Sequence, residues 1–195
     1  MVEMDALDVI ARTRGKVEMD EVPTGGNLFL VWGWPSAVFF LLEFLLWQRF
    51  HQLWCLWVWA GLLLVAVPLM VHTVHKDRQR THTRTRSAKL ILDYWMLAGL
   101  ACCALAFLFG FVGLLRVCLF PIICLLVGIG SFITGEVLRF RPKMTGGLLG
   151  CAIGIGSFLL QGEYWHWQIL AVSVVSAVTL IIPGYLYNKR IKDGV

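Results

Sequence analysis

Six apolar segments, separated by short polar stretches, constrain the fold of this chain more than any sequence motif does. We place them at about residues 28–47, 53–73, 90–111, 115–138, 146–161 and 167–187. Most are close to the roughly 20 residues that an α-helix needs to cross the hydrocarbon core of a bilayer. The pattern therefore predicts a membrane protein with six transmembrane spans.

The spans are expected to be helices, because a backbone in lipid must satisfy its hydrogen bonds within the segment or in a closed barrel. The sequence lacks the alternation of polar and apolar residues that is typical of a barrel strand. Hydrophobic residues make up 58% of the chain and charged residues 15%, whereas soluble domains have about half and about a quarter. We predict an all-α polytopic fold in which three helical hairpins form one transmembrane domain, residues 28–187.

Two polar segments flank this domain, an N-terminal segment of residues 1–27 and a tail of residues 188–195. Residues 3–13 are predicted to form a short amphipathic helix with one apolar face: Met4, Leu7, Ile10 and Ala11. Gly15 is expected to end this helix.

Positive charges are distributed unevenly between the two sides of the predicted bundle. Of the 17 Lys and Arg residues, 15 lie in the N-terminal segment, the second and fourth loops and the tail. The other two, Arg49 and Arg116, lie on the opposite side. Because cytoplasmic loops are enriched in Lys and Arg, we expect both termini in the cytoplasm and the protein in a bacterial inner membrane.

The basic loop after the second span is expected to contact anionic lipid headgroups on the cytoplasmic side. The residues concerned are Lys76, Arg78, Arg80, Arg84 and Arg86. Membrane topology explains the net charge of +5, so we expect no nucleic-acid partner. A protein partner or a homo-oligomer remains open.

Small residues at four-residue spacing predict close helix contacts. Gly146, Gly150 and Gly154 form such a series in the fifth span, and we favour packing within the chain over a dimer face. The first and third hairpins also resemble repeats, because Thr24-Gly25-Gly26 and Thr145-Gly146-Gly147 are each followed by a glycine, Gly33 and Gly154. Internal repeats are common in transporters, although hairpin duplication also produces them.

Ionisable residues within apolar spans are candidates for a functional polar site, because burying them in hydrocarbon is costly. Glu43 lies in the apolar stretch LLEFLLW, where it can reach the interface, pair with Arg49 or Arg116, or face the bundle interior. Asp93 and Glu136 lie near the inner ends of the third and fourth spans. The alternative for all three is ion pairing that fixes the helix ends, with Lys89, Arg139 and Arg141 as partners at the inner side.

The sequence predicts no metal or cofactor site. His51, Glu163 and His166 are expected on the same side as Glu43, but no pair has the i, i+4 spacing on one helix that would preorganise a metal site. Zinc-protease, nucleotide-binding and hydrolase motifs are also absent from the sequence. We therefore expect a protein without a cofactor, and favour a non-catalytic role over an enzyme.

Three stretches carry a resemblance to a known group of proteins. They are Asp5-Ala6-Leu7-Asp8-Val9-Ile10, Leu30-Val31-Trp32-Gly33-Trp34 and Ile182-Pro183-Gly184-Tyr185-Leu186-Tyr187-Asn188-Lys189. With these, the chain resembles a family of small, uncharacterised inner-membrane proteins of Bacteroidetes-type bacteria. The resemblance covers a minority of the chain and implies six helices, with no activity, cofactor or binding residue.

Two functions are compatible with these features. The leading hypothesis is binding or transport of a small solute or lipid, based on the hairpin repeat, the glycine-rich spans and Glu43. The alternative is a non-catalytic regulatory or scaffold subunit of a membrane complex, based on the absent motifs, the basic loop and the short N-terminal helix.

Overall fold

The computed structural model describes residues 26–51, 58–78, 90–91, 93–95, 97–102, 104–105, 119–160 and 162–193. Within these residues the chain is all-helical and contains no strand. The main helices are α2 (Asn27–Phe50), α3 (Val58–Arg78), α5 (Leu119–Val137), α6 (Arg141–Ser157), α7 (Trp167–Ser176) and α8 (Ile182–Asp193). A short 3₁₀ turn, η2 (Gly162–Tyr164), precedes α7, and the π-helical segment η3 (Ala177–Ile181) joins α7 to α8.

Three continuous helices are long and apolar enough to cross a membrane: Asn27–Phe50, Leu119–Val137 and Trp167–Asp193. A shorter apolar helix covers Gly61–Thr73 within α3, and α6 has 17 residues. Four described pieces of helix between residues 90 and 105 lie in the third predicted span. The predicted N-terminal helix, residues 3–13, lies outside the described residues.

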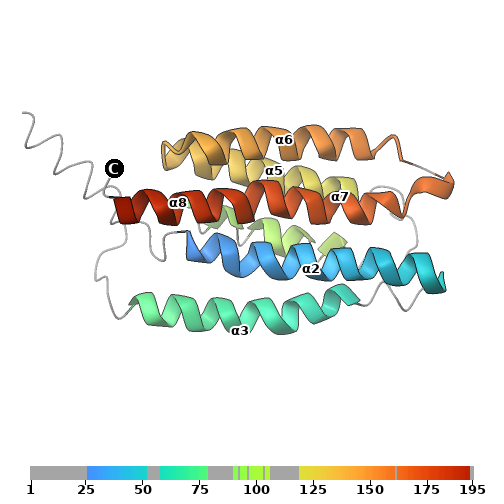
Figure 1. Ribbon diagram of the computed structural model, residues 1–195, viewed down its shortest axis with the longest axis horizontal. Helices are drawn as coiled ribbons and strands as arrows, with labels where there is room; N and C mark the ends of the chain where they lie inside the picture. The colour runs from blue at the N-terminus through green and yellow to red at the C-terminus, as the bar shows by residue number, and fades with distance from the viewer. Residues whose placement is uncertain are drawn as a thin grey trace, which may run out of the picture.

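The helices form a bundle in which α2 lies between α3 and the long helix α7–α8, with α5 and α6 beyond that helix (Figure 1). The beginning of α2, the end of α3, the beginning of α6 and the end of α8 lie at one end of the bundle (Figure 1). We call this the basic end, because Lys143 and Arg190 lie there on α6 and α8. The other is the opposite end.

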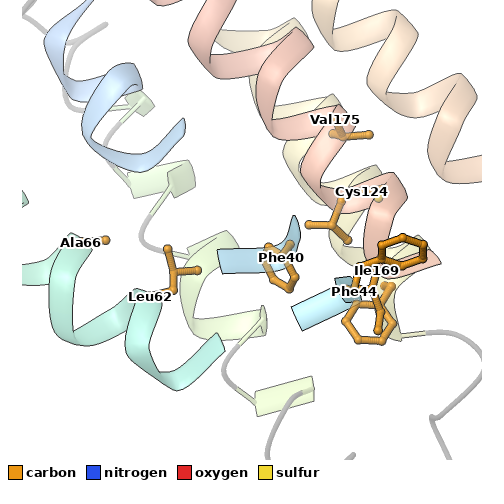
Figure 2. Close-up of a cluster of buried hydrophobic side chains, with 9 residues drawn as sticks. Phe40, Phe44, Leu62, Ala66, Cys124, Ile169 and Val175 are labelled. Carbon is orange, nitrogen blue, oxygen red and sulfur yellow. The ribbon is translucent and has the colours of Figure 1, made fainter. Parts of the chain in front are cut away.

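The hydrophobic core lies where α2, α3, α5 and α7 meet (Figure 2). Phe40 and Phe44 project from α2, Leu62 and Ala66 from α3, and Cys124 from α5. Phe40 packs edge-on against Phe120 at the start of α5, with ring centroids 6.3 Å apart. Many leucines and valines on the outer surface are exposed, which suits a bundle surrounded by lipid.

Helix α6 folds back on α5 through a tight turn. Arg139 has a left-handed backbone conformation, with φ of 48°. The Phe140 N–H donates to the Gly135 carbonyl at 2.8 Å, and the Arg139 N–H donates to the Glu136 carbonyl at 3.0 Å. This pair of bonds is a Schellman motif, which satisfies the last carbonyls of α5 and directs the chain into α6.

Candidate functional site

A groove of about 650 Å³ lies between α2 and α3. Leu30, Val31 and Val38 line it from α2, and Val65 and Leu69 line it from α3. Its walls are mostly apolar, and Val38, Val65 and Leu69 are themselves exposed on the outer surface of the bundle. The volume falls within the range of small-molecule sites, roughly 300–1,000 Å³.

The groove becomes polar at the basic end of the bundle. Gly61 lies against Phe39, which sets the pairing of the antiparallel helices and brings Asn27 level with Thr73. Asn27, His72 and Thr73 line this part of the groove. The Thr73 hydroxyl donates to the Leu69 carbonyl of its own helix, whereas His72 is exposed. The groove therefore combines a long apolar wall with a polar end.

Glu43, the first predicted site residue, faces the interior of the bundle and is 0% exposed. Phe40 and Phe44 are also buried residues of α2, and they come before and after Glu43 in the sequence. Neither carboxyl oxygen of Glu43 has a hydrogen-bond partner among the described residues. Arg49 is exposed and forms no ion pair with Glu43, and Arg116 lies outside the described residues.

Gln168 is a second fully buried polar residue, which the sequence reasoning did not single out. Its Nε2 donates to the carbonyls of Ser157, at 3.2 Å, and Leu160, at 2.6 Å. These carbonyls lie at and just beyond the end of α6, where a helix leaves acceptors unsatisfied. The two bonds fix the orientation of the amide, and its Oε1 has no partner among the described residues.

Asp93 and Glu136, the other predicted site residues, are exposed. Neither forms an ion pair with Arg139 or Arg141 within the described part of the chain, and Lys89 lies outside it. Both are near the basic end of their helices, whereas Glu43 is one and a half to two turns before the end of α2 at the opposite end. The three carboxylates therefore do not form one site.

Among the described residues, Lys143 is the largest side chain that is fully buried, although the sequence pattern places it among the topology-setting charges of a loop. It is the third residue of α6, and the Schellman turn directs it into the bundle. Its Nζ donates to the Thr179 carbonyl at 3.3 Å and lies 3.4 Å from the centroid of the Phe29 ring. A buried ammonium is thus held by a carbonyl and a cation–π contact.

The availability of the Thr179 carbonyl follows from the sequence of the last helix. In an α-helix this carbonyl would accept from the N–H of residue 183, which is Pro183 and has no N–H. The helix forms a π-turn over Ala177–Ile181, which ends two residues before the proline. Lys143 Nζ and Ser131 Oγ, the latter at 3.4 Å, donate to the carbonyl instead.

Aromatic rings close the region around Lys143. Phe29 packs edge-on against Tyr187, with centroids 6.4 Å apart, and Tyr187 packs edge-on against Phe140 at 5.3 Å. All three rings are buried. The Phe29 ring contacts Lys143 from α2, so the lysine connects α2, α6 and the π-turn.

The predicted packing glycines are all buried on α6. A Cβ atom at Gly146 would lie 2.7 Å from the Val178 carbonyl oxygen, and one at Gly154 would lie 3.1 Å from the Leu125 side chain. At Gly150 it would lie 3.3 Å from the Gly128 Cα atom on α5. The backbone of α6 thus approaches both α5 and the π-turn closely, which only small residues permit.

The predicted headgroup contacts are mostly outside the described structure. The backbones of Lys76 and Arg78 belong to the last turn of α3, but their side chains are not described. Arg80, Arg84 and Arg86 lie outside the described residues. Among the residues that the structure describes, no group of three or more His, Cys, Asp or Glu residues is arranged to hold a metal ion.

The comparisons with known proteins add no family or relative. No protein-family model matches the chain. No curated protein and no solved structure matches it either.

Proposed function

We propose that this protein is a six-span inner-membrane protein of a bacterium, with both termini in the cytoplasm, that binds a lipid in the groove between α2 and α3. The basic end of the bundle then faces the cytoplasm, in agreement with the enrichment of cytoplasmic loops in Lys and Arg. Three apolar helices of membrane-spanning length support the membrane location.

The observation that carries the lipid proposal is the shape and chemistry of the groove. Its apolar walls, which include Leu30, Val38 and Val65, suit an acyl chain, and its outer edge lies on the exposed apolar surface. A lipid can therefore enter laterally from the bilayer without crossing a polar barrier. A water-soluble ligand would find few polar groups along the groove, and those lie at one end.

The polar end indicates where the headgroup lies. Asn27 and His72 face the groove at the level where the cytoplasmic headgroups are expected. Lys76 and Arg78 belong to the last turn of α3, and Arg80, Arg84 and Arg86 follow in the sequence. Because these residues are positively charged, the proposed ligand is an anionic phospholipid.

Thermal unfolding of the purified protein in detergent, with and without added lipid, tests this proposal. Phosphatidylglycerol is expected to raise the melting temperature more than phosphatidylcholine, because a ligand that binds only the folded state stabilises it. At about 100 times the dissociation constant the gain is about 2.7 kcal/mol. Val38→Trp, which fills the groove, is expected to remove the gain.

Leu149→Trp on α6 is the matched control, because Leu149 is exposed to a similar extent as Val38, 56% against 51%. This variant is expected to keep the stabilisation by phosphatidylglycerol. Equal loss in both variants, or no lipid-dependent stabilisation in the wild type, contradicts the proposal. Co-purification of a stoichiometric protein without bound lipid would instead favour a regulatory or scaffold subunit.

A further inference from the structure

The buried acceptors at the opposite end of the bundle belong to one layer. The Ser173 hydroxyl donates to the Ala37 carbonyl at 2.8 Å, and the Phe44 ring stacks on His166 with centroids 6.1 Å apart. Because α2 and α7 run antiparallel, both contacts imply the same register between the two helices. This register places Glu43 level with Trp167, the residue directly before Gln168. Phe44 also contacts Trp167, with centroids 5.2 Å apart.

Glu43 and Gln168 therefore occupy the same level of two adjoining helices, and both are 0% exposed. Their free atoms, Glu43 Oε1, Glu43 Oε2 and Gln168 Oε1, are the buried side-chain polar atoms without a partner in the described part of the chain. Gln168 cannot satisfy Glu43 by rotating its amide, because its Nε2 already donates to two carbonyls of the α6 end. Within the described part of the chain, no donor is hydrogen-bonded to any of these three oxygens.

Buried polar groups in native proteins are almost always paired, and each exception calls for an explanation. Three buried oxygens, with one negative charge between them, match the ligands that small hard cations prefer. A single carboxylate balances a single positive charge. A divalent ion would keep a net charge in an apolar layer, which is unfavourable.

We propose that Glu43 and Gln168 form a binding site for one small monovalent cation, either Na⁺ or a proton, near the non-cytoplasmic end of the bundle. Na⁺ would be bound by the oxygens of both residues. A proton would sit on the Glu43 carboxyl, which would then donate to the Gln168 Oε1. This proposal is independent of lipid binding, because the groove lies on the other side of α2 near its beginning.

Few other charged or titratable side chains lie at this end of the described structure. They are Cys124 on α5, Arg49 and His51 at the end of α2, and Glu163, Tyr164 and His166 before α7. Cys124 is buried, His166 is half-buried, and the other four are exposed. Because water screens the exposed groups, Glu43 is the carboxylate expected to hold the cation.

Melting curves of the purified protein in detergent test the site in two arms. The first arm compares NaCl with choline chloride at constant ionic strength. The second arm covers a series of pH values without sodium. The first arm detects Na⁺ and the second detects a proton. We expect one arm to shift the melting temperature of the wild type by about 2–4 °C or more. Glu43→Gln is expected to abolish that shift, and Glu136→Gln, which changes an exposed carboxylate on α5, is expected to retain it.

A wild type that responds in neither arm, or a response that Glu43→Gln retains, overturns the proposal. If Glu43→Gln does not fold, its melting curves cannot be compared with those of the wild type. The wild type is then labelled with a hydrophobic carbodiimide, a reagent that modifies buried carboxyl groups. Glu43 is then expected to be modified, as read by peptide mass spectrometry, and Na⁺ or high pH is expected to slow its modification. Modification that neither condition changes also overturns the proposal.

Discussion

The two ends of the bundle treat a buried charged residue in opposite ways. At the basic end, Lys143 is fully buried, yet it donates to the Thr179 carbonyl and contacts the Phe29 ring. At the opposite end, Glu43 is equally buried, and no described residue donates to it. Burial without solvent is costly for both, but only the lysine has contacts that offset the cost.

The difference separates two roles that look alike in sequence. A buried charge with dedicated partners connects elements of the fold, and here Lys143 connects α2, α6 and the π-turn. A buried charge without partners weakens the fold unless something outside the chain completes it. We therefore expect substitutions of Lys143 to affect folding, and substitutions of Glu43 to affect binding.

Lys143→Glu is expected to have the largest effect. The new carboxylate would face the Thr179 carbonyl and the Phe29 ring, both of which repel negative charge, with no described cation beside it. Such uncompensated burial is expected to destabilise the protein by more than about 4 kcal/mol. Size-exclusion chromatography in detergent should show aggregation, whereas Lys189→Glu, at an exposed position of α8, should remain monodisperse.

Glu43→Leu should stabilise the protein in sodium-free buffer. It removes a buried carboxyl that lacks a hydrogen-bond partner, and it extends the apolar face formed by Phe40 and Phe44. We expect a gain of about 1–3 kcal/mol in the free energy of unfolding, measured by denaturant titration in mixed micelles. A loss of stability would show that Glu43 supports the fold as Lys143 does, and would remove the contrast between the two ends.

Pro183→Ala tests whether the missing N–H prepares the site of Lys143. Alanine restores a donor that can reach the Thr179 carbonyl within the helix, in competition with the lysine. We expect Lys143→Met to destabilise the Pro183→Ala variant less than it destabilises the wild type. The difference is expected to be about 1 kcal/mol, the net value of one hydrogen bond. The double-mutant cycle measures this coupling, and additive effects would contradict it.

Glu43→Gln should have the smallest effect on folding. Glutamine has nearly the same shape as glutamic acid and can donate to the Gln168 Oε1 without carrying a charge. The change in unfolding free energy is expected to be below about 1 kcal/mol in sodium-free buffer. A larger loss in the same titration would indicate that the carboxyl group has a structural partner.

Much of the fold follows from local sequence. The apolar segments predict helices, and the structure is all-helical over its described residues, with three helices long enough to span a membrane. The helix that contains the start of the fifth predicted span begins earlier than the apolar segment does, because α6 starts at Arg141 and the apolar segment near residue 146. The left-handed residue Arg139 fixes where α6 begins. A glycine at this position would have marked a tight turn in the sequence, but the residue is an arginine.

The candidate site could be predicted only in part. The apolar neighbours of Glu43 made it a candidate, but its burial depends on α7, more than a hundred residues away. The burial of Lys143 could not be read from charge counts, which treat every loop lysine alike. Pro183 carries a usable signal, since it frees a carbonyl within a helix, but the donor that reaches this carbonyl is set by packing.

The π-turn also changes the rotational phase of the last helix. Gln168 and Tyr187, both buried, are 19 residues apart, which in an uninterrupted α-helix would rotate them by about 100° relative to each other. One additional residue in the π-turn absorbs this difference, so that both side chains face the bundle. Shortening the segment by one residue would turn α8 by about 100° and expose Tyr187 to the surrounding lipid. The length of this turn therefore determines which face of α8 packs against the rest of the bundle.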